Sequence, residues 1–184
     1  MAISDFFKRM MLAGALSIEN GRISVMGKYN IVFVEADSLA YLYQKVIEEI
    51  GEEKTEKILL EACKIAMEKV FKIFNIPTIE DLQDIKPLKN LESFLDIYGL
   101  GKVEIKNVFR DEKSGNIILD VIIKNSPILE FSKNVFNGKS RVCILYKVNL
   151  YVWAKLFTNR EVIVEEIRCH SKGDEVEEFK VAII

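Results

Sequence analysis

The sequence predicts an α+β fold in which an antiparallel sheet is covered by a layer of helices. Apolar residues recur at helical spacing through residues 37–98, and from Gly99 the pattern changes to the alternation of strands. Paired alternating segments stand near both ends of the chain, at residues 16–25 and 161–183, and are typical of hairpins. The order hairpin, helices, strands, helix, hairpin is that of an antiparallel sheet with helices packed against it.

The N-terminal part is expected to contain one short helix and one hairpin. Residues 4–12 have the pattern of a short amphipathic helix. Residues 16–19 and 22–25 alternate around an Asn-Gly dipeptide, the strongest short-range signal for a two-residue turn. The apolar run 31–34 is predicted to be extended.

Two long helices are predicted next. The first begins where Asp37 or Ser38 can cap it and stops at Gly51. Its apolar positions are Leu39, Leu42, Tyr43, Val46, Ile47 and Ile50. The second runs from about residue 53 to residue 74. Its expected buried stripe consists of Ile58, Leu59, Ala62, Ile65, Ala66, Val70 and Ile73.

Prolines and glycines divide the middle of the chain. Prolines bracket two shorter helices, expected near residues 78–85 and 88–97. Strands are expected at residues 103–106 and 117–123, the second apolar enough to be largely buried. A short helix is expected after Pro127.

The last elements are a long helix and a hairpin. Ser140 is predicted to cap a helix over residues 141–157, which is apolar on almost every side. Such a helix is buried all round, faces a cavity or enters a subunit interface. Residues 161–169 and 175–183 are expected to form the closing hairpin.

Length and charge set the class of protein. The 184 residues can bury a sizeable core, and we predict one domain over residues 1–184. The net charge of −2, with no free-standing basic block, argues against a nucleic-acid partner. Three cysteines, an odd number, and no signal peptide indicate a cytoplasmic protein with free or metal-bound thiols. The longest apolar stretch, residues 142–157, carries two lysines and is too short to span a membrane.

Local catalytic motifs give little indication of an enzyme. Tyr98-Gly99-Leu100-Gly101 leads from a helix into a strand, the reverse of a dinucleotide-binding loop, and lacks the third glycine. The sequence has no phosphate-binding loop, no Gly-x-Ser-x-Gly turn and no Cys-x-x-Cys pair. His170 alone, at a strand end, is a polar turn residue unless a nucleophile or carboxylate is aimed at it. The sequence leaves open whether the protein is an enzyme.

Several segments together resemble the 4-vinyl reductase domain family over nearly the full chain. They are Tyr98-Gly99-Leu100-Gly101 before a strand, the run 121–127, Val142-Cys143 at the late helix, and Cys169, Gly173 and Phe179 in the final hairpin. The resemblance implies a small-molecule-binding domain with the fold of TRAPP transport-particle subunits, which have an apolar cavity and form dimers. It therefore implies a homodimer and a hydrophobic ligand beside Tyr146, Leu150 and Trp153.

The resemblance also implies a metal site. In the family, the places of Cys143, Cys169 and Glu177 are typically cysteines, a set that suits tetrahedral zinc. Here the third place is a glutamate, whose oxygen can replace sulfur, and His170 offers a nitrogen. Cys143, Cys169, Glu177 and His170 are therefore the candidate zinc ligands. The alternative is that loss of the third cysteine has abolished the site and left two free thiols.

Strand geometry decides which of these residues can meet. Successive strand residues face opposite sides, so Cys169 and His170 cannot both reach one ion unless the strand frays or bulges. A two-residue turn at Gly173 would pair Arg168 with Glu177, which would then be an ordinary cross-strand salt bridge. For Glu177 to share a face with Cys169, the register must shift by one residue, for example through a bulge at Gly173.

Two classes of function remain. The first is a cytoplasmic domain of the 4-vinyl reductase type that binds a hydrophobic small molecule, holds zinc and acts as a sensor through a partner protein. The second is a catalytic or assembly role. It would be a reductase accessory or enzyme in tetrapyrrole-type metabolism, or a dimeric scaffold like the transport-particle subunits.

Overall fold

The computed structural model describes residues 16–19, 22–25, 27–32, 34–76, 78–79, 92, 99–111 and 114–184. Its elements are β1 (Leu16–Glu19), β2 (Arg22–Val25), β3 (Tyr29–Ile31), α2 (Ala36–Ile50), α3 (Glu52–Phe74), β4 (Lys102–Arg110), β5 (Ile117–Lys124), α5 (Pro127–Phe136), α6 (Ile144–Thr158), β6 (Val162–Arg168), the 3₁₀ helix η1 (His170–Lys172) and β7 (Glu177–Ile183). The α+β class predicted from the sequence is confirmed. No helix among these residues has the length and apolar character needed to cross a membrane.

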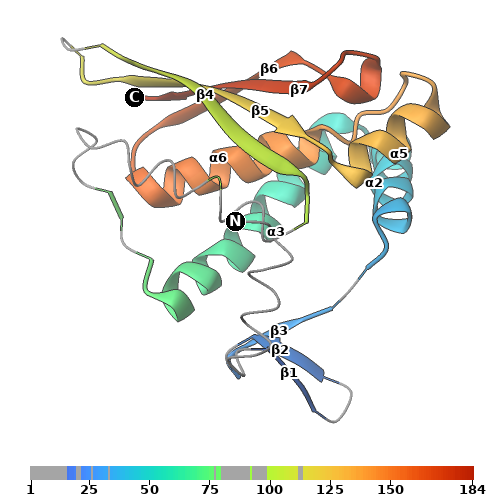
Figure 1. The fold of residues 1–184 in the computed structure, drawn as a ribbon, viewed down its shortest axis with the longest axis horizontal. Helices are drawn as coiled ribbons and strands as arrows, with labels where there is room; N and C mark the ends of the chain where they lie inside the picture. The colour runs from blue at the N-terminus through green and yellow to red at the C-terminus, as the bar shows by residue number, and fades with distance from the viewer. Residues whose placement is uncertain are drawn as a thin grey trace.

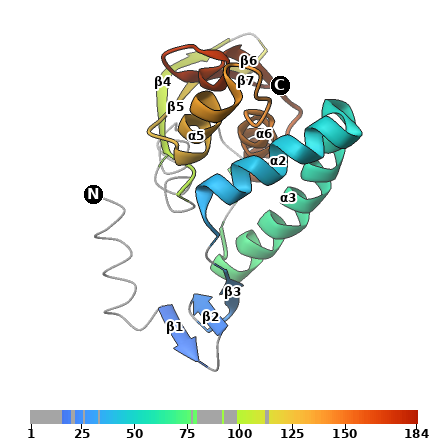
Figure 2. The same ribbon diagram turned by 90° about the vertical axis from the view of Figure 1, so that its right-hand side faces the viewer.

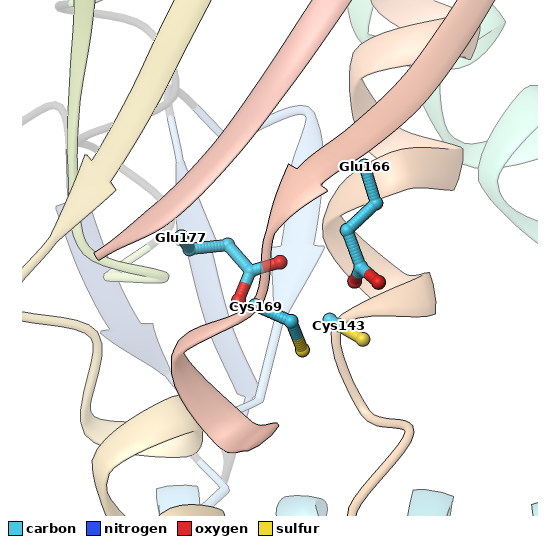
Figure 3. Close-up of side chains that lie close together, drawn as sticks. All are labelled: Cys143, Glu166, Cys169 and Glu177. Carbon is cyan, nitrogen blue, oxygen red and sulfur yellow. The ribbon is translucent and has the colours of Figure 1, made fainter. Parts of the chain in front are cut away.

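A four-stranded antiparallel sheet forms one layer of the molecule, and the helices lie on one side of it (Figure 1). Its strand order is β4-β5-β7-β6, so β5 and β7 are central. Val121, Ile122 and Ile123 of β5 are all buried, as the continuous apolar run of this strand predicts. The end of β6 and the start of β7 lie over the first turn of α6 (Figure 3).

Helix α6 is the centre of the core. It packs against α3 on one side and against β6 and β7 on the other. Trp153 is fully buried, and its ring lies 5.6 Å from that of Phe157 and 5.4 Å from that of Phe71 in α3. Burial within the chain therefore accounts for most of the apolar circumference of this helix.

The N-terminal hairpin is confirmed. β1 and β2 pair from Leu16↔Val25 to Glu19↔Arg22, which leaves the two residues of the Asn-Gly dipeptide between them. β3 adds a third strand to this small sheet. Figures 1 and 2 show the small sheet on the far side of the helices from the large sheet.

Three predicted helices fall mostly or wholly outside the described residues. The helix expected at residues 4–12 lies entirely outside them. Of the two expected near residues 78–85 and 88–97, only residues 78, 79 and 92 are described. Residues 78–79 are not helical, whereas Glu92 is.

The N-terminal cap predicted for the first long helix is wrong. α2 begins at Ala36 with Glu35 at the N-cap position, and no side chain caps it. Ser38 donates a hydrogen bond to the Glu35 carboxylate at 3.1 Å, and Asp37 lies in the first turn, where its charge favours the positive helix end. Gly51 ends the helix as predicted, with a φ of 87°.

The buried stripe predicted for α3 is wrong at three of its positions, because Ala62 is exposed along with Ile58 and Ile65. Ile58 and Ile65 are 54% and 71% exposed. The positions that the chain does bury on this helix include Thr55, Met67 and Val70. The apolar arc of the helix is wider than the surface that α6 and α2 cover, so a stripe of it remains outside.

Ser140 does not cap the late helix. A turn at residues 142–143 precedes α6, which begins at Ile144 with Cys143 at the N-cap position. The buried hydroxyl of Ser140 instead accepts a hydrogen bond from the backbone N–H of Val142 at 3.3 Å. This turn fixes Cys143 at the end of the helix that lies under β6.

The closing hairpin contains a one-residue shift in register. β6 and β7 pair in the register that a turn at Gly173 predicts as far as Glu166. The next pair is Arg168↔Glu178, so Ile167 is an extra residue and forms a β-bulge. The shift proposed for Gly173 is therefore real but lies in the strand, not in the turn.

The turn itself is longer than predicted. η1 follows β6, and Gly173 then takes a φ of 116° before the chain reaches β7. Arg168 donates to the Glu178 carboxylate at 2.5 Å. The predicted salt bridge between Arg168 and Glu177 is therefore wrong, and Glu177 is left to the interior.

Candidate metal centre

Four side chains from three segments meet beside the end of β6 (Figure 3). We call Cys143, Glu166, Cys169 and Glu177 the Cys/Glu cluster. The two sulfurs and one oxygen of each carboxylate all lie within 4.8 Å of one another. Ligands of a tetrahedral zinc ion lie about 3.3–3.8 Å apart, given zinc–ligand distances of about 2.0–2.3 Å. If the four ligand atoms moved slightly closer together, one ion could contact all of them.

The bulge in β6 is what brings two of the four to the same side. Val162 and Val164 are buried and share a face with Glu166, by the alternation of the strand. In a regular strand, Glu166 and Cys169 would face opposite sides because they are three residues apart. The extra residue, Ile167, is 50% exposed and restores Cys169 to the inner face.

Glu177 enters the cluster from the start of β7 and is fully buried. Its Oε2 accepts a hydrogen bond from the backbone N–H of His170 at 2.9 Å. Its Oε1 has no hydrogen-bond partner among the described residues. A buried carboxylate oxygen without a partner is costly and usually indicates a role or a missing ligand.

The loop after β6 is held in place by its own polar groups. The Cys169 N–H donates to the Asp174 carboxylate at 2.7 Å, and the Asp174 N–H donates to the Cys169 carbonyl at 3.2 Å. The Cys169 sulfur lies 3.5 Å from the hydroxyl of Ser171, which is itself fully buried. Cys169 is therefore positioned without help from an ion.

The four groups perturb one another electrostatically. A hydrogen bond from the Cys143 thiol lowers the pKa of Cys169 to about 7, against the effect of burial. The same hydrogen bond and burial raise the pKa of Cys143. Burial raises the pKa of Glu177 to about 9, and the nearby Cys169 adds to this. Although burial opposes it, hydrogen bonds from Cys143 and Lys172 lower the pKa of Glu166.

Two thiol groups and two carboxylates form a donor set that fits zinc. Zinc accepts both sulfur and carboxylate oxygen and is most often four-coordinate in structural sites. The unpartnered Oε1 of Glu177 supplies a donor that no group of the described chain uses. The ammonium group of Lys172 lies 2.6 Å from Glu166 and offsets part of the negative charge of the carboxylates.

His170 does not join the cluster. Its Nδ1 lies 3.0 Å and 3.2 Å from the carbonyl oxygens of Asp174 and Glu175. Its side chain lines a cavity of about 340 Å³ on the other side of the loop, together with Ser126. Its backbone N–H, by contrast, holds the Glu177 carboxylate.

Tyr146, Leu150 and Trp153, the residues expected beside a ligand, are all buried on α6. The Tyr146 hydroxyl donates to the Leu100 carbonyl at 2.9 Å and is hydrogen-bonded to Ser126, and burial raises its pKa. Two cavities in the described part of the chain, of about 340 and 430 Å³, are lined by other residues.

Glu166 is the member of the cluster that sequence reasoning misses. With Glu165 it reads as a pair of strand-edge charges. The sequence contains an indication of its position, because residues alternate between the two faces of a strand and Glu166 occupies the same face as the buried Val162 and Val164. A charged residue that continues an apolar row is a candidate ligand.

No family model matches the chain, and no curated protein sequence matches it. A solved structure titled as the phenol-responsive sensory domain of the transcription activator PoxR with phenol is similar, with a TM-score of 0.71 and 13% identity, over 98% of this chain and 90% of that one. An H-NOX protein from S. oneidensis in the Fe(II)NO state matches less well, with a TM-score of 0.48 and 12% identity, over 98% of this chain and 89% of that one. The first similarity shows that this chain shares the fold of a small sensory domain.

Proposed function

We propose that this chain is a cytosolic small-molecule-binding domain of the 4-vinyl reductase type that holds one zinc ion in the Cys/Glu cluster. The observation that carries the metal is the convergence of four ligand atoms within 4.8 Å, one of them on a fully buried carboxylate with an unpartnered oxygen. Protein zinc sites use sulfur and carboxylate ligands of this kind.

Zinc would act here as a cross-link. It would join the first turn of α6, the end of β6 and the start of β7, adding bonds between three elements that already pack together. Bound zinc stabilises a fold because its site does not exist in the unfolded chain. The chain supplies the thiolates, while Lys172 and the His170 N–H orient the carboxylates.

The ligand-binding part of the proposal is supported by fold and by aromatic content. The chain shares its fold with a sensory domain whose solved structure holds phenol. Tyr146, Leu150 and Trp153 lie on the buried helix between the sheet and α3. We place a hydrophobic ligand beside these three residues and expect the domain to act as a homodimer.

Elemental analysis of purified protein tests the metal. We expect about one zinc per chain in the wild type and in Cys63→Ser, because Cys63 lies outside the cluster. Cys169→Ser should lose most of the metal. A wild-type protein without zinc would exclude the site. A Cys169→Ser variant with as much zinc as the wild type would exclude it too.

Fluorescence of Trp153, the single tryptophan, tests the ligand. Titration with phenol should give a saturable change in emission in the wild type. Leu150→Phe would narrow the proposed pocket without adding a second tryptophan and should weaken saturation, whereas Ile163→Phe on the outer face of β6 should not. A linear response in all three proteins would indicate collisional quenching and no site.

A further inference from the structure

A cavity of about 430 Å³ reaches the Cys/Glu cluster from the molecular surface. It lies between the first turns of α3 and α6 and the end of β6. Its lining residues are Glu52, Cys143, Ile144, Lys147, Val164, Glu165, Glu166 and Ile167. Ile167 is 50% exposed, so the cavity is open at this edge of the sheet.

The cavity meets only one side of the cluster. Of the four cluster residues, Cys143 and Glu166 belong to its lining. Glu177 is fully buried behind them and is held by the backbone of His170. The cluster therefore has an open side, formed by one thiol and one carboxylate, and a closed side.

The lining is charged in favour of cations. Three carboxylates, those of Glu52, Glu165 and Glu166, stand against the single ammonium of Lys147. Lys147 is paired with Glu56 at 2.8 Å, while Arg141 lies 3.6 Å from Glu52 and Lys172 lies 2.6 Å from Glu166. The four carboxylates of this group thus exceed its three cations by one charge. A cleft whose walls carry one sign of charge raises the local concentration of the opposite ion.

Glu166 is the ligand that can leave an ion at the least cost. Its Oε2 already accepts a hydrogen bond from Lys172 at 2.6 Å, so its charge stays paired without a metal. If Glu177 detached instead, its Oε1 would be left buried with no hydrogen-bond partner among the described residues, which is costly.

We propose that a divalent ion passes between solution and the Cys/Glu cluster through this cavity while the domain stays folded, with Glu166 as the ligand that detaches first. The proposal rests on the zinc site proposed above. Such a passage would let the occupancy of the site follow the concentration of free metal in solution. Without it, the metal would be bound once, during folding, and would not exchange.

Transfer of zinc from the loaded protein to the chromogenic chelator 4-(2-pyridylazo)resorcinol tests the passage. Ile167→Trp places a large ring at the mouth of the cavity and should slow release at least five-fold. Ile163→Trp is the matched control, since Ile163 lies on the same strand, is also 50% exposed and does not line the cavity. It should release zinc at the wild-type rate.

The role of Glu166 has its own test. Lys172→Met removes the alternative partner of the carboxylate and should slow release, whereas Lys180→Met, on the exposed face of β7, should not. Equal rates in Lys172→Met and the wild type would reject Glu166 as the first ligand to detach.

The outcomes separate the passage from the metal site. A wild-type protein without zinc would reject the site and the passage together. One zinc per chain with equal release rates in the wild type and Ile167→Trp would reject the passage alone. If Ile167→Trp fails to fold, Ile167→Phe places a smaller ring at the same mouth and must still release zinc more slowly than Ile163→Phe.

Discussion

The ionisation of Glu177 depends on whether an ion is bound. Its carboxyl is fully buried, and burial raises its pKa to about 9. Without a metal it is therefore protonated at neutral pH. A divalent ion would reverse this, because a positive charge at the unpartnered Oε1 favours the carboxylate.

The metal-free protein should lose stability as the pH rises from 5 to 7. In the unfolded chain Glu177 ionises near a pKa of about 4.3, whereas in the folded state it stays protonated to about pH 9. The unfolded state thus binds fewer protons in this window, and stability falls by at most about 1.4 kcal/mol per pH unit. Urea titrations of chelator-treated protein at pH 5, 6 and 7 measure this loss.

Glu177→Gln is the control for this pH dependence. The amide has nearly the same shape and does not ionise, so the variant should show a flatter profile between pH 5 and 7. The window stops at pH 7 because the lowered pKa of Cys169, about 7, works in the opposite direction above it. A variant whose profile matches the wild type would mean that Glu177 does not cause the slope.

Cys63 should be much less reactive than an ordinary thiol. Burial raises its pKa to about 11, and its sulfur lies 3.4 Å from the Asn149 side-chain oxygen. At pH 7.5 the thiolate fraction is then roughly 300-fold below that of a thiol with a pKa of 8.5, and alkylation should slow in proportion. Iodoacetamide labelling followed by mass spectrometry of peptides measures the rate.

The cluster thiols provide the contrast. Chelation should make Cys169 react faster than it does in the zinc-loaded protein, because its pKa of about 7 leaves much of it as thiolate, while its exposure of only 3% keeps it slower than a free thiol. Cys63 should stay slow with or without chelator. A labelling rate at Cys169 that chelation leaves unchanged would contradict its release as a thiolate.

At the scale of elements, the sequence predicts the strands of the final hairpin and their register up to Glu166, but not the bulge at Ile167. A bulge depends on which face each later residue must reach, and that is decided by the buried side chains of β7 and α6. The local sequence around Ile167 has no glycine to mark the position. For this reason the meeting of Cys143, Cys169 and Glu177 was expected from a family resemblance, and Glu166 was not expected.

Helix boundaries show the same limit. Ser140 has the residue type of a cap, but the turn at residues 142–143 delays the helix, because Val142 is fully buried in the core there. Ser126 does cap its helix, accepting from the Leu129 N–H at 3.2 Å ahead of a proline at the first helical position. Residue type shows which side chains can cap a helix, while packing selects the one that does.

Gly101 should be hard to replace, because β4 starts there close to the end of β5. A Cβ at this position would lie 2.8 Å from the Lys124 carbonyl oxygen, and the φ of Gly101 is 127°. Gly101→Ala should therefore lower the free energy of unfolding by about 2–4 kcal/mol, as steric and backbone strain together do. Urea denaturation provides the measurement.

Gly115→Ala is the matched control for strain alone. Gly115 also has a positive φ, of 72°, but no atom lies within 4 Å of its added Cβ. Its loss should be about 1–2 kcal/mol, the cost of a left-handed conformation for alanine. A Gly101→Ala cost no larger than this would show that the Lys124 backbone moves aside.

At the scale of the whole molecule, most of the apolar surface that the sequence marks for burial is inside the chain. α6 is enclosed by α3, β6 and β7, so its apolar circumference no longer requires a second subunit. One apolar stripe that stays exposed lies on α3, where Ile58 and Ile65 are 54% and 71% exposed and Ala62 between them is also exposed. Leu42 of α2 is exposed as well. Helical spacing marks these positions for burial, and the chain alone does not bury them.

A second copy of the chain fits this stripe by charge. If two α3 helices cross antiparallel near Ala62, the flanking residues Lys57 and Glu61 lie opposite Glu68 and Lys64 of the other copy. Every such pair joins opposite charges, and a small residue at the crossing point lets the helices approach closely. We therefore expect the homodimer interface on α3, one of the long helices.

Light scattering across a dilution series tests this interface. The wild type should be dimeric at micromolar concentration, and Ile65→Lys should be monomeric, whereas Ile163→Lys on the outer face of the sheet should remain dimeric. A charge exchange is more specific. Glu61→Lys should weaken the dimer because it faces Lys64 of the other copy, and adding Lys64→Glu should restore it. A double variant as weak as Glu61→Lys would exclude the antiparallel pairing, and a wild type that is monomeric throughout would exclude the dimer.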